Sequence, residues 1–537
     1  MDKNPGFYKK IDCSKTKKRP KGYVFTPAPH QVLVMNYFRD SIYKGLLLYH
    51  KLGSGKSCSS IMIADDMLRA KKVDKVYVLS PGSLRKNWVS EYCRVCGSIE
   101  KELMSKFTFI TYNYNIITHL SKYDFTNSLV IIDEVHNLIN GYKNNSKNAT
   151  GLYEKIMVSN ARVLALSGTP IIQENISQDW KNLARLLDGG RSDKTDTILE
   201  KNVKGIVSYY PGDATKYPTV YIKPIQRVQM TPEQYLKYKN VYQHEQKVRN
   251  MGPPDPKMKH KNPVRYNMLV QDYIKAKKYL LSRMVSNCFY EPIQDIITYK
   301  TKESIEVDTK EESDVSDASD DDVKKAFSMK CDSTCKIYPD KLKKEQGWIT
   351  KKALSNGTLL SISPKFVAIF LNIIKHINSK HVVYSFYKTR SGVQLIYSLL
   401  THCGITAELY SGDISSKKRE EILNQFNDES NRNGKHIKVL LLTEAGSEGI
   451  SVLECNNIHI VESSTRENRT RQAIGRVIRY KSHEKLPKEE QYVNVWRYWS
   501  VYGKEKLVDE ELFYKGLEHE KNLEMFTNML IKNSIEQ

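Results

Sequence analysis

Short apolar runs alternate with longer amphipathic stretches along the first half of this chain. The runs are rich in Leu, Ile, Val and Phe, and they lie at 46–48, 76–79, 107–112, 129–132 and 162–166. Helical patterns precede the first run, as at 32–38, and lie between the runs, as at 59–64. This alternation predicts the buried strands of a parallel β-sheet with helices packed against it.

The second half repeats the pattern. Further β-rich runs lie at 381–386, 406–409, 438–442 and 458–461, with helical stretches between them. We therefore predict the α/β class, with two domains that each contain a parallel sheet and that face one another across a cleft.

Composition changes between the two halves. Residues 225–300 are helical in pattern and basic, and the acidic, low-complexity stretch 303–323 cannot bury a core and should be disordered. The expected organisation is a basic flexible arm at 1–22, a first domain at 23–225, a helical insertion at 226–355, a second domain at 356–500 and a helical extension at 501–537.

A glycine-spaced turn follows the first apolar run and precedes a helix. Its residues Gly53, Ser54, Gly55, Lys56 and Ser57 fit the end of the phosphate-loop pattern, although His50 stands where that pattern has its first glycine. The glycines let backbone amides approach phosphate oxygens, and the helix N-terminus favours an anion. Lys56 adds positive charge, and the Ser57 hydroxyl can bind Mg²⁺, so we expect ATP and Mg²⁺ here.

Polar residues follow two further apolar runs. Asp133 and Glu134 come directly after 129–132, where Asp133 can hold Mg²⁺ and Glu134 can polarise the water that attacks the γ-phosphate. Ser167, Gly168 and Thr169 follow 162–166 and could sense the γ-phosphate. Parallel strands place such groups together at the carboxyl edge of their sheet.

The second half has no phosphate loop of its own. It carries Arg476 and Arg479 three residues apart on an expected helix, which would place both guanidinium groups on one face. Such a domain is suited to completing the ATP site of its neighbour, with an arginine stabilising the transition state.

Charge, cysteine content and hydrophobicity indicate which partners and which cellular compartment to expect. The 537 residues include 84 Lys and Arg against 61 Asp and Glu, a formal net charge of +23 that suits nucleic acid, although a lysine-rich proteome also makes its proteins basic. Nine scattered cysteines indicate a reducing intracellular compartment. Two cysteine pairs, Cys93 with Cys96 and Cys331 with Cys335, could alternatively supply four thiolates to a zinc ion. No apolar run approaches 18 residues, so we expect no membrane span.

Taken together, these blocks resemble the motifs of the superfamily 2 helicase and translocase ATPases, in the order of that family, over about residues 25–500. The resemblance implies RecA-like domains. It also implies that Gln31, Gly449 and Gln472 contact ATP and that His136, Ser167, Gly168 and Thr169 couple hydrolysis to movement. Nucleic-acid contacts would come from Ser83, Thr111, Tyr112, Ser385 and Thr443.

Finer detail, such as Ser167–Ile171 and Ile474–His483, resembles the Swi/Snf-like ATPases of large DNA viruses. That branch includes the poxvirus-type early transcription factor small subunit and nucleoside triphosphatase I. It implies a DNA-dependent ATPase of viral transcription, in the virion and the host cytoplasm, with RNA polymerase or another transcription factor as partner. A strand-separating DNA or RNA helicase and a promoter-binding factor are the alternatives.

Overall fold

The computed structural model describes residues 11, 13, 19, 23–51, 53–81, 85–98, 100–111, 117–171, 176–190, 203–289, 362–388, 391–444, 450–465 and 467–537. The chain divides into two compact units. The first comprises Met1–Lys216 and His519–Gln537, and the second comprises Tyr217–Glu518. The acidic stretch 303–323, Cys331 and Cys335 lie outside the described residues.

The first unit is built on a six-stranded sheet in the order β3-β2-β4-β5-β1-β6, and every pair of neighbours is parallel. The predicted parallel sheet is confirmed. Its strands are β1 (Gly45–His50), β2 (Lys75–Ser80), β3 (Phe107–Thr111), β4 (Ser128–Asp133), β5 (Arg162–Ser167) and β6 (Val207–Tyr210).

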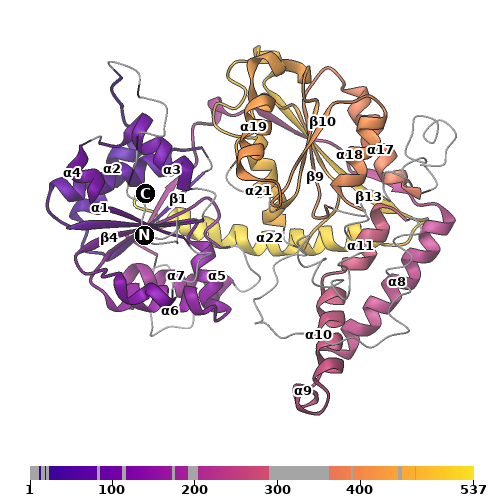
Figure 1. Cartoon of the computed structure of the whole chain (residues 1–537), viewed down its shortest axis with the longest axis horizontal. Coiled ribbons are helices and arrows are strands. Elements are labelled where there is room, and N and C mark those ends of the chain that lie inside the picture. The colour runs from indigo at the N-terminus through magenta and orange to yellow at the C-terminus, as the bar shows by residue number, and fades with distance from the viewer. Residues whose placement is uncertain are drawn as a thin grey trace. The chain divides into compact units, whose positions relative to one another are not determined.

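Helices pack against both faces of this sheet (Figure 1). Because side chains alternate along a strand, Leu46 and Leu48 join the core on one face and Leu47 joins the core on the other. The first face is covered by α1 (Pro29–Asp40), α2 (Lys56–Arg69), α3 (Arg85–Glu91), the π-helical turn Tyr92–Cys96 and α4 (Lys101–Ser105). The second face is covered by α5 (His136–Lys143), α6 (Lys147–Val158) and α7 (Ile176–Asp188).

Two disulfides join segments on the first face. Cys13 pairs with Cys93, and Cys58 at the start of α2 pairs with Cys96. The expectation of reduced thiols is therefore wrong for these four cysteines, because folding brings together residues that are scattered along the sequence. Arg19 also donates to the Gly97 carbonyl oxygen at 2.8 Å, so the described residues of the arm at 1–22 are fastened to the first unit.

The second unit contains a sheet in the order β10-β11-β9-β12-β13-β7, with β8 also paired to β13, and all these pairs are parallel. The expected boundary at residue 225 is too late, because β7 already pairs with β13 in this second sheet. The strands are β7 (Thr219–Ile222), β8 (Gln226–Gln229), β9 (His381–Tyr384), β10 (Ala407–Tyr410), β11 (Val439–Leu442), β12 (Asn457–Ile460) and β13 (Tyr492–Val501).

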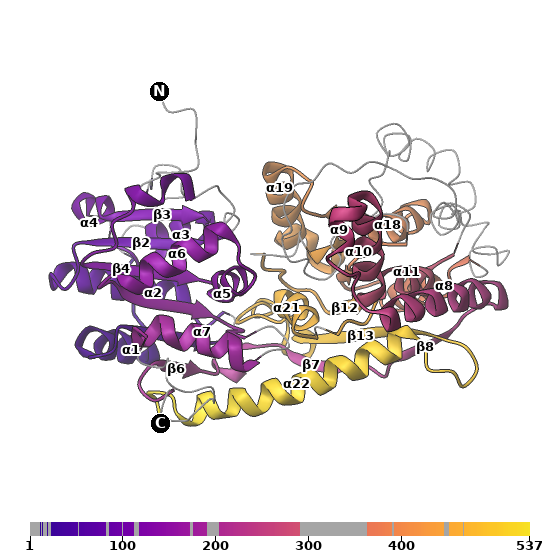
Figure 2. The same cartoon turned by 90° about the horizontal axis from the view of Figure 1, so that it is seen from below.

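The second sheet also has a core on each face. One contains residues of α8 (Pro232–Met251), α17 (Pro364–Lys375) and α18 (Val393–His402), and the other contains residues of α19 (Ser416–Asn427) and α21 (Glu467–Val477). Helices α8 and α10 (Pro263–Lys277) lie side by side, joined through α9 (Met258–Lys261), and α11 (Leu280–Asn287) leads back toward the sheet (Figure 2).

Helix α22 (Val508–Lys532) contributes to both units. Leu512, near its beginning, lies in a core of the second unit, and Phe526 and Leu530 lie in a core of the first. Among the described helices, none has a stretch that is long and apolar enough to cross a bilayer.

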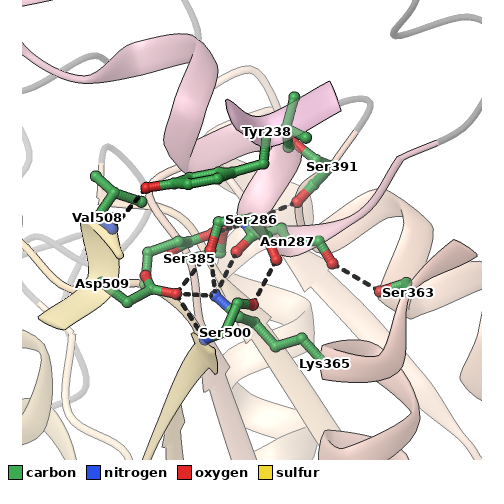
Figure 3. A network of polar contacts seen from close by, with 12 residues as sticks. Tyr238, Ser286, Asn287, Ser363, Lys365, Ser385, Ser391, Ser500, Val508 and Asp509 are labelled. Carbon is green, nitrogen blue, oxygen red and sulfur yellow. Dashed lines mark hydrogen bonds and ion pairs between the residues drawn. The ribbon is translucent and has the colours of Figure 1, made fainter. Parts of the chain in front are cut away.

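A buried polar network fastens α11, α17 and the start of α22 within the second unit (Figure 3). Lys365 Nζ lies 2.7 Å from Asp509 Oδ2, and the two side chains are 0% and 1% exposed. Asp509 also accepts hydrogen bonds from the Ser286 hydroxyl at 2.6 Å and the Ser500 amide at 2.9 Å. The ammonium charge is therefore buried together with its counter-charge and its hydrogen-bond partners.

Candidate nucleotide site in the first unit

The phosphate loop connects β1 to α2. Gly53 and Gly55 have φ values of 84° and 82°, a left-handed conformation that glycine adopts without strain. Helix α2 begins at Lys56, whose ammonium donates to the His50 carbonyl oxygen at 2.7 Å. The sequence prediction of strand, glycine turn and helix is thus confirmed as a local structure, with Lys56 and Ser57 in the first turn of α2.

Gln31 supports this loop from α1. Its Nε2 donates to the Gly55 carbonyl oxygen at 3.2 Å, and its Oε1 accepts the Ala28 amide at 2.9 Å. A Cβ atom at Gly55 would lie 2.8 Å from Gln31 Nε2, so a larger residue there would displace the end of this side chain. The observed hydrogen bonds of the buried Gln31 are with the loop and with the residue that precedes α1, and its contact with adenine stays a prediction.

Asp133 and Glu134 stand at the carboxyl end of β4, next to β5 and two strands away from β1. Burial and the neighbouring Glu134 raise the pKa of Asp133, the charge of Lys56 opposes the rise, and the resulting pKa is about 7. The charges of Lys56 and Asp133 therefore interact, as they would in an ATP site. Glu134 has a φ of 50°, a strained conformation for a residue other than glycine and one often found at functional sites.

Two of the predicted coupling residues contact Glu134, and a third contacts one of these two. The Ser167 hydroxyl donates to Glu134 Oε2 at 3.4 Å, and His136 Nδ1 lies 3.2 Å from Ser167 Oγ and 3.4 Å from Glu134 Oε2. The Thr169 amide donates to Ser167 Oγ at 3.0 Å. Residues from β4 and β5 therefore form one hydrogen-bonded cluster around the predicted catalytic carboxylate.

The donor set fits Mg²⁺. Ser57 offers a hydroxyl oxygen and Asp133 a carboxylate oxygen, the hard ligands that Mg²⁺ binds together with water and phosphate oxygens. The raised pKa of Asp133 shows a carboxylate whose charge is incompletely compensated by its surroundings. Among the described residues, no cluster of three or more His, Cys, Asp or Glu could hold a metal by itself, and Cys93 and Cys96 are disulfide-bonded rather than zinc ligands.

The predicted arginines do not share a helix. Arg476 lies in α21 with Gln472, but α21 ends at Val477, so Arg479 follows in the turn after the helix. There the Arg479 guanidinium donates to the Ser451 hydroxyl. The prediction of two arginines on one helical face is therefore wrong.

The predicted nucleic-acid contacts have different surroundings. Ser385 is fully buried, and its hydroxyl donates to Glu462 Oε1 at 2.6 Å, so it has no exposed surface for a strand and this prediction is corrected. Thr443 is 6% exposed, and Thr111 is partly exposed at the end of β3. Ser83, Tyr112 and Gly449 lie outside the described residues.

The sequence did not predict the side chains that contact the phosphate loop and the end of β1. His30 stacks on Tyr210 with a centroid distance of 3.6 Å, and its Nε2 lies 3.1 Å from the Ser54 carbonyl oxygen. Ser208 contacts both His50 and Glu536. Ser208 and Glu536 are far apart in the sequence and carry no local motif, so only the fold could reveal them.

The chain is similar to a known domain model and to several viral proteins. The model of the helicase conserved C-terminal domain matches residues 365–481. A protein of Acanthamoeba polyphaga mimivirus named as an ATP-dependent RNA helicase is 27% identical over 95% of this chain and 90% of its own length. The termination factor NPH-I homolog of an African swine fever virus isolate is 25% identical over 98% of this chain and 82% of its own length.

Two further similarities extend this set. The early transcription factor 70 kDa subunit of Yaba monkey tumor virus is 24% identical over 88% of this chain and 72% of its own length. The solved helicase domain of Hef from Pyrococcus furiosus covers 91% of this chain and 98% of its own, with 18% identity and a TM-score of 0.45. Residues 365–481 therefore match the helicase conserved C-terminal domain, and the chain is similar over most of its length to viral proteins named as a helicase, a termination factor and an early transcription factor subunit.

Proposed function

We propose that this chain is a nucleic-acid-dependent ATPase that couples ATP hydrolysis to translocation on DNA in viral transcription. The observation that carries the proposal is the site of the first unit, where Lys56, Asp133 and the Glu134 cluster stand at the carboxyl edge of one parallel sheet. The viral relatives named as a termination factor and an early transcription factor subunit support the transcription setting.

In this mechanism the loop amides and Lys56 would bind the ATP phosphates, and Ser57 and Asp133 would hold Mg²⁺, whose charge would offset that of the phosphates. Glu134 orients and polarises the attacking water, and Ser167 and His136 hold its carboxylate in place. Arg476 and Arg479 would supply the positive charge that stabilises the transition state. Gln472 and Gly449 stay predicted ATP contacts.

Translocation would use phosphate contacts, which position a strand without reading its sequence. The net charge of +23 fits such contacts, and binding should therefore weaken steeply as salt rises. We propose the loops at Ser83, Thr111, Tyr112 and Thr443 as the contact sites, with virion and host cytoplasm as the location and RNA polymerase or another transcription factor as the partner.

A strand-separating helicase is the second candidate, and the mimivirus relative named as an ATP-dependent RNA helicase favours an RNA substrate for it. A promoter-binding factor is the third, favoured by the early transcription factor subunit. It should protect specific sequences in footprinting, whereas a translocase should not.

Steady-state ATP hydrolysis distinguishes the candidates when it is measured at low salt without polymer and with double-stranded DNA, single-stranded DNA and single-stranded RNA. Stimulation by double-stranded DNA, together with displacement of a stalled polymerase, is the expected result. Stimulation by RNA alone would contradict the DNA assignment, and equal rates in all four mixtures would contradict dependence on nucleic acid.

A further inference from the structure

The residues that follow α22 are hydrogen-bonded to β6, the edge strand beside the phosphate-loop strand. The Ile535 amide donates to the Val207 carbonyl oxygen at 2.9 Å. The Glu536 carboxylate accepts the Ser208 hydroxyl through one oxygen and the Tyr209 amide at 2.8 Å through the other. Three consecutive residues of β6 are thus bonded to this segment, which places Glu536 at a fixed position in the first unit.

Ser208 transmits this contact to the phosphate loop. Strand β6 pairs with β1 so that Ser208 lies opposite Leu48 and Tyr210 lies opposite His50. Ser208 Oγ lies 2.8 Å from His50 Nε2, and both side chains are fully buried. Because the Ser208 proton is donated to Glu536, its oxygen must accept the His50 Nε2 proton, which leaves His50 Nδ1 unprotonated.

The surroundings of His50 agree with a neutral ring. Burial and, to a smaller extent, the charge of Lys56 together lower the pKa of His50 to about 3. Its Nδ1 is buried and has no hydrogen-bond partner in the described residues, so no acceptor there would stabilise a protonated Nδ1. The ring also contacts His30 edge-on at a centroid distance of 5.6 Å, and His30 Nε2 lies 3.1 Å from the Ser54 carbonyl oxygen.

His50 is the last residue of β1 and stands where the phosphate-loop pattern has glycine. Its carbonyl oxygen holds Lys56 Nζ at 2.7 Å. A glycine here would have no side chain to anchor, whereas the His50 ring is held from behind by Ser208. The orientation of the loop at its entry therefore depends on a side chain whose hydrogen bond is set by Glu536.

We propose that Glu536, acting through Ser208 and His50, is a positioning residue for the phosphate loop and sets its affinity for nucleotide phosphates. The proposal rests on one part of the proposed function, namely that the first unit binds ATP. It does not depend on translocation, on nucleic acid or on the second unit. Residues outside every helicase motif would thus control the ATP affinity of this chain.

The test compares Ser208→Ala, Glu536→Ala and their double variant in the full chain. Binding of a fluorescent ATP analogue with Mg²⁺ is measured without polymer, together with kcat and KM of basal hydrolysis and the urea midpoint of unfolding. Each single variant should weaken nucleotide binding about tenfold, the effect of losing one buried hydrogen bond, with kcat nearly unchanged. The double variant should lose no more nucleotide affinity than either single variant, because all three variants break the same chain of hydrogen bonds from Glu536 through Ser208 to His50.

Two further variants separate positioning from folding. Ser208→Thr keeps the hydroxyl and should retain most of the affinity. Ser534→Ala removes a buried hydroxyl that has no hydrogen-bond partner in the described residues of the same segment, and should change neither binding nor KM.

Wild-type affinity in both Ser208→Ala and Glu536→Ala would overturn the proposal. So would multiplying effects in the double variant, or an affinity loss that only follows a fall in the urea midpoint. Failure of the proposed function can be recognised separately. If the variants lower ATP affinity as expected but no nucleic acid stimulates hydrolysis by the wild type, only the proposal of translocation is contradicted.

Discussion

The buried ion pair between Lys365 and Asp509 gives a sharp prediction about stability. We expect Lys365→Met to open the second unit locally, because the substitution leaves the Asp509 carboxylate buried without its counter-charge. The pair is 0% and 1% exposed, and its Nζ–Oδ2 distance is 2.7 Å. Removing one partner of such a pair costs about 3–5 kcal/mol, whereas an exposed pair contributes at most about 1 kcal/mol.

The structure offers a matched control. Lys418 lies 4.0 Å from Glu421 on the surface of the same unit, with side chains 58% and 54% exposed. Lys418→Met should therefore have little effect. A second variant, Lys365→Met with Asp509→Asn, removes both charges and should recover part of the loss, since no unpaired charge then remains buried.

Hydrogen exchange of β13 is a direct assay, because the Ser500 amide of that strand donates to Asp509. A loss of 3 kcal/mol or more raises the equilibrium population of the open form, and with it the exchange rate, about a hundredfold or more. Exchange in Lys365→Met that matches Lys418→Met would refute the reasoning. A further loss on adding Asp509→Asn would refute it equally.

Three other predictions concern the carboxylates of both units and the Ser167 cluster. Because Asp133 has a pKa of about 7, Mg²⁺ must displace a proton below that pH, and apparent Mg²⁺ affinity should fall about tenfold per pH unit under pH 7; a Mg²⁺ titration from pH 6 to 8 checks this, and a profile equal to that of Asp133→Asn would contradict it. Ser167→Ala removes the hydroxyl that bonds Glu134, so polymer-stimulated kcat should drop about tenfold with ATP binding retained; unchanged stimulation in the same hydrolysis assay would argue against coupling. Burial raises the pKa of Glu245 from 4.5 to about 7, so the native state binds more protons than the unfolded state between these pH values, and the free energy of unfolding should fall by roughly 3 kcal/mol as pH rises through this range. Urea midpoints at pH 5 and 7.5 should show this fall in the wild type and not in Glu245→Gln. An equal change of midpoint with pH in both proteins would contradict the prediction.

The sheet and the local site could be predicted because both depend on short-range patterns. Five of the six strands of the first sheet coincide with mainly apolar runs, whereas β6 with Ser208 was not predicted, and the phosphate loop needs only the order of strand, glycines and helix. The end of α21 could not be predicted in this way, because the sequence pattern continues through Arg479 while the helix stops at Val477.

Contacts between distant segments could not be predicted, because short-range sequence patterns carry no information about them. Ser208 and Glu536 meet only because α22 returns to the first unit, and Cys58 and Cys96 pair only because two helical segments pack on one face of the sheet. Ser385 was placed by its position in a motif, but the partner that accepts its hydroxyl, Glu462, lies three strands further along the chain. Pairwise contacts of this kind require the folded structure.

The central claim is that the first unit hydrolyses ATP with Glu134 as the residue that activates water. Its most direct test compares ATP hydrolysis and ATP binding in the wild type, in Glu134→Gln and in Glu154→Gln, an exposed glutamate of α6, with double-stranded DNA at low salt. The account predicts that Glu134→Gln binds ATP as the wild type does but loses at least about a hundredfold in kcat, while Glu154→Gln keeps full activity. Near-normal turnover in Glu134→Gln would contradict it.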